Sequence, residues 1–361
     1  MYRQIFRPIL FRFSAHRAHR RILAFLRFVE RIPLGRQLLR LRYRKEFPAL
    51  KQELFGLEFP NPVGLAAGFD TDGEYFNELS DLGFGFIEIG TLTPSPQSFT
   101  GDALNAIIPG QGAIVHRDIH ANKGVLNAID NIKAHRPDGI VAANISYNRN
   151  TSDDGIERDL DTAFSLLYDF VDMFVFNISI APHGQRSHLE DVSSLNEVMD
   201  TLLERRADMD EIKPVLLKIS PDMQSDQVDA VLRYSMRYGI DGIVVGDAVM
   251  NRHGMLSGRF SSEDCHVSGA PVFEKSLAMV RHVKEFTLGR LPIVGVGGIM
   301  SPQQALEMFK AGASLIELYT GILNEGPGLV KEILSFLDER KKAAEAAAAD
   351  EVPGNGDEES M

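Results

Sequence analysis

The sequence predicts a (β/α)8 (TIM) barrel with an N-terminal amphipathic helical extension. The first observation is a series of eight short, β-rich runs at residues 62–68, 84–91, 140–146, 173–179, 215–220, 242–247, 292–298 and 315–321. They are apolar almost throughout, as strands covered on both faces are. The second observation is that helical patterns fill most of the gaps, at residues 156–171, 191–208, 224–239, 273–286, 301–311 and 327–340. Eight strand–helix units in about 280 residues are typical of a closed barrel.

The alternative architecture is a doubly wound open sheet. It is less favoured because no early glycine-rich strand-to-helix fingerprint with a later acidic residue appears. The 361 residues, of which 44% are apolar and 24% charged, allow a sizeable core and exclude disorder of the whole chain. Cys265 is the only cysteine, which excludes a disulfide scaffold, and no run of 18 apolar residues could form a spanning helix.

Charge divides the chain unevenly. Residues 1–45 contain twelve arginines and Lys45 but only one acidic residue, Glu30, so they carry +12 within a chain of net charge −12. The remaining residues therefore carry −24. An acidic whole argues against a nucleic-acid partner, whereas a basic head indicates that one end meets a negatively charged surface.

The basic head is amphipathic in a helical rhythm. Ile5, Ile9 and Phe13 recur every four residues, a second apolar stripe spans residues 22–29, and residues 33–35 break the pattern. We expect two short helices that lie in a membrane interface. The alternative is a helix pair docked on the body with solvated arginines. The head lacks the apolar core of a secretory signal, so we expect a cytoplasmic, peripheral protein on the inner face of the cell membrane.

These features divide the chain into three parts. Residues 1–45 form the basic amphipathic segment, residues 46–340 form the barrel, and residues 341–361 form an acidic tail. We expect the first half of the tail to extend the last helix. Because the tail has no core to build, we predict that it is disordered.

The carboxyl ends of the predicted strands carry the candidate site, because side chains there face the active site of a barrel. The residues at these ends are Ala67, Gly68, Thr91, Asn144, Asn177, Ser179, Lys218, Asp247, Gly297, Gly298, Tyr319 and Thr320. They form a set of hydrogen-bonding groups rather than a hydrolytic triad, although each alone is compatible with a strand-end cap. A buried Lys218 is costly unless it meets an anion or an electron-rich ring.

Glycine-rich sequences end the last two strands. Residues 295–299 read GVGGI, and residues 319–321 read YTG. Glycines let backbone amides approach a phosphate, and the loops after strands seven and eight are where barrels most often hold one. The alternative is a tight turn that needs a positive φ. Together the two motifs favour a phosphate site.

Three further motifs give weaker evidence for a functional site. Asp70–Gly73 suggests a cation loop, but no glutamate follows at calcium-loop spacing, so a turn or helix cap is favoured. His116 and His120 are four residues apart in a loop-like stretch with no third ligand, so we predict no metal site. No local feature lowers the pKa of the Cys265 thiol enough to make it a nucleophile.

Long motifs of this chain resemble the quinone-linked, membrane-associated class of dihydroorotate dehydrogenase. They are NPVGLAAGFD (61–70), GFGFIEIGTLTP (83–94), RLPIVGVGGI (290–299), AGAS (311–314), YTG (319–321) and RAH (17–19). The resemblance implies a (β/α)8 barrel that carries FMN and oxidises a small molecule, dihydroorotate, to orotate in pyrimidine biosynthesis. It further implies that a quinone takes the electrons and enters through the helices of residues 1–45.

The resemblance also implies a flavin site. The residues that fall where the family contacts FMN are Ala66, Ala67, Gly68, Thr91, Asn144, Asn177, Lys218, Gly269, Gly297, Gly298, Tyr319 and Thr320. Two positions depart from the family: a threonine is replaced by Gly246, and the Gly-Gly-Leu-Ser-Gly string reads CHVSG at residues 265–269. A similar string at residues 254–259 lies eleven residues too far from GVGGI and is taken as a decoy.

At most positions of the implied substrate site, this chain has a different residue from the family. The substrate-side positions are Thr71 in place of a lysine, His116 in place of an asparagine, Asp247 in place of an asparagine, and Asn177, which alone is clearly retained. The catalytic base is unknown, because the family's serine is Ile180 here and isoleucine cannot take a proton. Ser179 and His183 are the nearby candidates to replace it.

Two functions follow. The first is an FMN-dependent oxidoreductase of the dihydroorotate dehydrogenase type that turns over dihydroorotate poorly and acts on a different substrate. The alternative is a non-catalytic homologue that keeps the flavin, or only the fold, as a membrane-associated binding or regulatory protein. The retained flavin positions favour the first, and the rewritten substrate loops favour the second.

Overall fold

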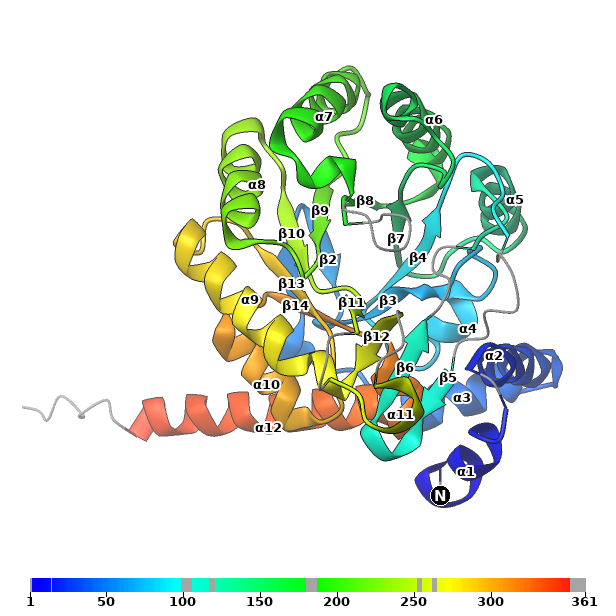
Figure 1. Cartoon of the computed structure of the whole chain (residues 1–361). Coiled ribbons are helices and arrows are strands. Elements are labelled where there is room, and N and C mark those ends of the chain that lie inside the picture. The colour runs from blue at the N-terminus through cyan, green and yellow to red at the C-terminus, as the bar shows by residue number, and fades with distance from the viewer. Residues whose placement is uncertain are drawn as a thin grey trace, which may run out of the picture.

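Eight parallel strands close into a barrel, as the sequence predicts (Figure 1). This computed structural model describes residues 2–13, 15–98, 106–116, 121–179, 187–251, 255–261 and 265–350. The barrel strands are β3 (Val63–Asp70), β4 (Phe86–Leu92), β7 (Ile140–Ile145), β8 (Met173–Asn177), β9 (Val215–Ile219), β10 (Gly242–Val245), β13 (Ile293–Val296) and β14 (Leu315–Leu318). Each pairs with the next, and β14 closes onto β3.

Helices surround the barrel and alternate with its strands (Figure 1). They are α4 (Phe76–Ser80), α5 (Val125–Ala134), α6 (Ile156–Leu167), α7 (Val192–Ala207), α8 (Ser225–Tyr238), α9 (Phe273–Thr287), α10 (Pro302–Ala311), α11 (Thr320–Glu325) and α12 (Leu329–Asp350). All six helices that the sequence patterns indicate are present, and α4, α5 and α11 are additional. Helix α12 continues to Asp350, which confirms that the first half of the tail extends the last helix. Residues 351–361 lie outside the described part, so the predicted disorder stays a prediction there.

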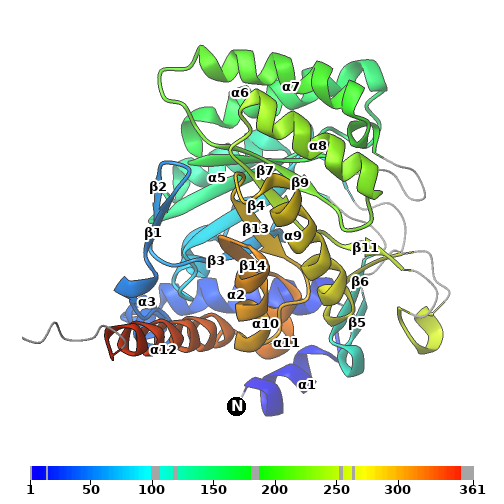
Figure 2. The ribbon, with the colours of Figure 1, turned by 90° about the vertical axis from the view of Figure 1, so that its left-hand side faces the viewer.

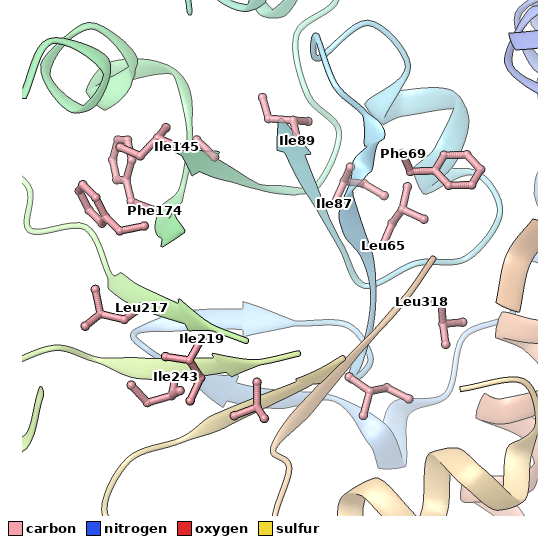
Figure 3. Packing of buried hydrophobic residues seen from close by; sticks show 14 of the residues in the cluster. Leu65, Phe69, Ile87, Ile89, Ile145, Phe174, Leu217, Ile219, Ile243 and Leu318 are labelled. Carbon is pink, nitrogen blue, oxygen red and sulfur yellow. The ribbon is translucent and has the colours of Figure 1, made fainter. Parts of the chain in front are cut away.

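Strand alternation divides the apolar residues between two packed regions. One face of each strand packs against the helices, where Ile87, Ile89 and Phe174 are fully buried (Figure 3). The other face fills the barrel interior with residues such as Phe86 and Leu216. The short hairpin β1 (Gln52–Leu54) and β2 (Leu57–Phe59) adds Phe59 to this inner cluster, edge-on to Phe86 with ring centroids 5.4 Å apart.

A second sheet lies beside the barrel. Its strands are β5 (Ala106–Ile108), β6 (Ala113–His116), β11 (Val249–Met250) and β12 (His266–Gly269), paired antiparallel in the order β11-β12-β6-β5. The sequence indicates only long loops over residues 92–122 and 249–272. The structure corrects this, because the two loops pair with each other through β6 and β12.

The N-terminal segment, residues 2–43, contains a π-helical turn (Tyr2–Phe6), α1 (Arg7–Leu10), α2 (Ala15–Arg31) and α3 (Gly35–Tyr43). The predicted break at residues 33–35 is present, with Leu34 at φ 66°, but a helix unforeseen in the sequence follows it. Figure 2 shows α2 and α3 on the same side of the barrel as α12. Within the described ranges, no helix has the length and hydropathy needed to cross a membrane.

Candidate functional site

A cavity of about 630 Å³ lies at the carboxyl ends of the strands. Its walls come from three parts of the chain: the strand ends, the second sheet and the N-terminal segment. The strand ends contribute Ala66–Asp72, Thr91, Asn177, Lys218, Gly246–Ala248, Val296–Ile299, Glu317 and Tyr319–Gly321. The second sheet adds Ile114, His116, Ser268 and Gly269, and α2 adds Ala15, His16, His19, Arg20, Leu23 and Ala24.

The cavity brings most of the predicted flavin positions together. The twelve predicted residues all line it except Asn144, which lies behind Lys218 and donates a hydrogen bond to Glu88 Oε1. Residues 257 and 258 of the decoy string do not line the cavity, whereas Ser268 and Gly269 do. Period-two alternation explains the placement, because Asn144, Asn177 and Lys218 each lie two residues after an inward apolar residue of the same strand.

Lys218 lies on the floor of the cavity within a buried charged cluster that the sequence analysis missed. Its Nζ donates to Glu88 Oε1 at 3.1 Å, and both side chains are almost fully buried. Burial lowers the pKa of Lys218, but the carboxylates of Glu88, Glu317 and Asp247 outweigh this and raise the pKa above its usual value. Lys218 is therefore charged at neutral pH. A single glutamate in each of the apolar runs FIEIG and LIELY is the sequence signal that could have revealed the cluster.

Glycines form the opposite end of the cavity. Gly269, Gly297 and Gly298 have φ of 101°, 114° and 71°, where other residues are strained. A Cβ on Gly298 would lie 2.7 Å from the Phe273 nitrogen, and one on Gly269 would lie 2.2 Å from the Gly112 oxygen. Only glycine allows these backbone segments to approach each other this closely at the cavity wall.

The substrate-side positions also line the cavity. Asn177 Nδ2 donates to Asp247 Oδ2 at 3.0 Å, so the retained amide is engaged by the new carboxylate. His116 Nε2 and Ser268 Oγ are 2.8 Å apart, and Thr71 lies on the wall. The Ser179 hydroxyl donates to the Lys218 carbonyl at 3.4 Å and is not among the residues that line the cavity, and its role as a replacement base stays a prediction. Ile180 and His183 lie outside the described residues.

The Asp70–Gly73 motif forms a turn. Both oxygens of the buried Asp70 carboxylate accept backbone N–H groups, from Glu74 and Tyr75 at 2.8 Å. Burial raises the pKa of Asp70 to about 7, and these two hydrogen bonds oppose the shift. In the part of the chain that the structure describes, no group of three His, Cys, Asp or Glu residues could hold a metal ion; His120 lies outside that part.

Helix α2 forms the remaining wall with a buried histidine. The His19 ring meets Phe69 edge-on, with ring centroids 4.6 Å apart, and its Nε2 has no hydrogen-bond partner among the described residues. Burial lowers the pKa of His19 to about 4, so the imidazole is neutral at physiological pH. This neutral ring places its polar Nε2 among apolar side chains of the cavity wall.

Three relatives are similar to this chain over most of its length, and each is named dihydroorotate dehydrogenase (quinone). The protein of Christiangramia forsetii is 35% identical over 333 residues, which are 92% of this chain and 97% of the relative. That of Acinetobacter baylyi is 34% identical, and that of Coxiella burnetii is 36% identical, each over 92% of this chain and 98% and 95% of the relative.

Solved structures share the fold. The crystal structure of DHODH from Eimeria tenella in complex with ferulenol has a TM-score of 0.76 and 23% identity, over 88% of this chain and 93% of that one. The ligand-free form has a TM-score of 0.77 and 24% identity, over 86% and 94%. Residues 49–340 match the family model described as Dihydroorotate dehydrogenase. The chain therefore belongs to the dihydroorotate dehydrogenase family, in the branch whose members are named quinone-linked.

Proposed function

We propose that this chain binds FMN in the cavity and works as an oxidoreductase of the dihydroorotate dehydrogenase type. The observation that carries the proposal is that a buried cation, Lys218, and a glycine-lined end occupy the same cavity of about 630 Å³. A cation suits an electron-rich ring, and backbone amides freed of side chains suit a phosphate. FMN contains both groups in one molecule.

The chain's own donors fit each part of FMN. Lys218 uses one of its three N–H groups on Glu88, and the described residues provide no further partner, so the others remain for the ring. Backbone amides around Gly297, Gly298 and Thr320 would hold the phosphate, with the α11 N-terminus behind them. Bound FMN supplies an acceptor for two electrons.

We further propose that dihydroorotate, the substrate in the name of the relatives, is oxidised slowly. The cationic lysine of the family is Thr71 here, and the Asp247 carboxylate lines the same cavity, which opposes an anionic substrate. Ile180 cannot accept a proton, and a positioned base contributes about 10²–10⁴ in rate. These departures favour a different small-molecule substrate. A non-catalytic flavin protein is the second candidate, because the position of the base carries an aliphatic side chain.

The N-terminal segment supports a quinone as electron acceptor and a peripheral position on the inner face of the membrane. His16, His19 and Arg20 line the cavity from α2, which gives an apolar carrier a path beside the helix. Nine of the fourteen exposed large apolar side chains of the described residues lie in this segment. Basic and exposed apolar residues together suit an anionic lipid surface.

The first test is the visible spectrum of purified protein, followed by titration with FMN. We expect flavin absorbance and quenching of FMN fluorescence. Gly298→Ala should weaken binding at least tenfold, because the new Cβ meets Phe273 and Gly269. Gly239→Ala is the matched control, because Gly239 has a similar φ of 79° with nothing within 4 Å. Absence of both flavin signals would remove FMN from the proposal.

The second test mixes FMN-loaded protein anaerobically with millimolar dihydroorotate and follows flavin bleaching. We expect bleaching slower by about 10²–10⁴ than a positioned base allows. Bleaching within milliseconds would show that another group replaces Ile180. No bleaching by dihydroorotate or related dihydropyrimidines would favour the non-catalytic candidate.

A further inference from the structure

Two buried carboxylates, Glu88 and Glu317, interact with each other and with Lys218. Glu88 on β4 is 0% exposed and Glu317 on β14 is 2% exposed, and both strands place these residues on the inner face of the barrel. Glu88 Oε1 accepts from Asn144 and from Lys218 Nζ. Lys218 therefore compensates one of the two possible negative charges, and the second needs another explanation.

Two carboxylate oxygens of this cluster lack a hydrogen-bond donor in the part of the chain that the structure describes. Glu88 Oε2 and Glu317 Oε2 are both buried and have no donor among the described residues. Burial first, and then the interaction with Glu88, raise the pKa of Glu317 well above its usual value. Two ionised carboxylates cannot donate to each other, whereas an acid and a carboxylate can. One proton shared by the two side chains supplies the missing donor.

We propose that Glu88 and Glu317 hold one proton between them and act as a positioning pair for Lys218 at the floor of the cavity. With that proton, the three side chains are neutral together, and Lys218 keeps N–H groups for a ligand instead of dividing them between two carboxylates. The role toward a bound flavin rests on the proposed function; the shared proton does not.

The groups that face the pair come from four other positions. Asn144 on β7 and Lys218 on β9 contact Glu88, Asp247 follows β10 on the same cavity wall, and Tyr319 follows Glu317 closely. Asp247 raises the pKa of Glu317 further. Lys218 alone among these groups is positive and opposes the shift.

Infrared spectroscopy of the full-length protein, without added flavin, tests the proton directly. At neutral pH we expect a carbonyl stretch of a protonated carboxylic acid, above the amide I band, that shifts downward in D2O. Glu317→Gln and Glu88→Gln should each weaken the band to the same residual intensity, because one remaining carboxylate then pairs with Lys218. The residual intensity comes from Asp70 and Glu30, whose pKa values are raised to about 7. Glu307→Gln, on the exposed face of α10, should leave the band unchanged. An absent band, or one whose intensity neither buried substitution lowers, would overturn the proposal.

Urea unfolding as a function of pH gives a second measurement. The folded chain holds a proton that the unfolded chain releases above about pH 4.5. The unfolding equilibrium constant of the native protein relative to Glu317→Gln should therefore rise about tenfold per pH unit from about pH 5 up to the raised pKa of the folded pair, and level off above it. A constant ratio would contradict the shared proton. Because neither measurement uses FMN, failure of flavin binding would leave both results interpretable.

Discussion

The barrel and the N-terminal segment treat their apolar side chains in opposite ways. The strands bury nearly all of theirs, so that Phe174 and Ile87 are 0% exposed. The N-terminal segment buries only Ala15, Ala18, Leu23 and Leu26, and leaves nine large apolar side chains exposed. Its attachment to the barrel combines this small apolar contact with ion pairs, such as Arg27 with Glu78 at 2.9 Å.

This difference indicates that the barrel core stabilises the fold, whereas the exposed side chains of the N-terminal segment can contact a membrane. A packed core is insensitive to salt, whereas partly exposed ion pairs weaken as salt screens them. Asp81 is the strongest anchor, because its fully buried carboxylate accepts from Arg36 at 2.7 Å and Arg40 at 2.5 Å. The exposed apolar residues of the segment are therefore available to a membrane while Arg27, Arg36 and Arg40 contact the barrel.

A matched pair of phenylalanine substitutions should show the largest contrast. Phe174→Ala removes a ring that packs against Phe164 at 4.6 Å, and should lower the free energy of unfolding by about 3–5 kcal/mol. Phe28→Ala, at a position 61% exposed, should change it by less than about 0.5 kcal/mol. Urea unfolding measures both. Similar losses at the two positions would mean that Phe28 is packed as tightly as the barrel core.

Membrane binding should show the reverse contrast. Leu41→Asp, at a position 79% exposed in α3, should weaken sedimentation with vesicles that contain anionic phospholipid by about ten- to hundredfold, the equivalent of about 1.5–3 kcal/mol for one apolar side chain. Leu288→Asp is the control, because Leu288 is 81% exposed on the barrel and the charge change is the same. Binding should also fall with added salt. Equal effects of the two substitutions would contradict a membrane face on the N-terminal segment.

The Asp81 anchor should have a smaller but measurable effect. Asp81→Asn leaves Arg36 and Arg40 without their buried carboxylate and should cost about 1–3 kcal/mol, with faster tryptic cleavage of the arginine-rich segment. Asp138→Asn, at the exposed end of the same cluster, should cost less than about 1 kcal/mol. If both variants resist trypsin as the native protein does, the segment is anchored elsewhere.

The smallest effect concerns the pH dependence of docking. Burial, followed by the nearby Glu78 and Asp81 carboxylates, raises the pKa of Glu30 to about 7 from 4.5. The folded state therefore favours protonated Glu30, so this group lowers stability progressively as the pH rises from about 4.5 to about 7. Glu30→Gln should match the native melting temperature at the acidic end and exceed it above pH 7. A difference that does not change with pH would show that Glu30 titrates normally.

The sequence by itself determined the barrel, because eight apolar runs and six helical patterns are local signals that each segment carries alone. It also indicated the cavity residues, because strand ends meet on one face of any barrel. Helix α4 was not predictable in this way: it is only five residues long, too short for a periodic pattern.

Only the tertiary structure decided the second sheet, the contact of Ser179 and the carboxylate pair, because these features depend on contacts between distant segments. Strands β6 and β12 exist because residues 113–116 and 266–269 pair across the cavity rim. Ser179, near the predicted base position, instead bonds the Lys218 carbonyl of the neighbouring strand. Glu88 and Glu317 are 229 positions apart in the chain, and neither run reveals its partner. The closure of the barrel brings the two carboxylates together, and burial gives them one proton to share.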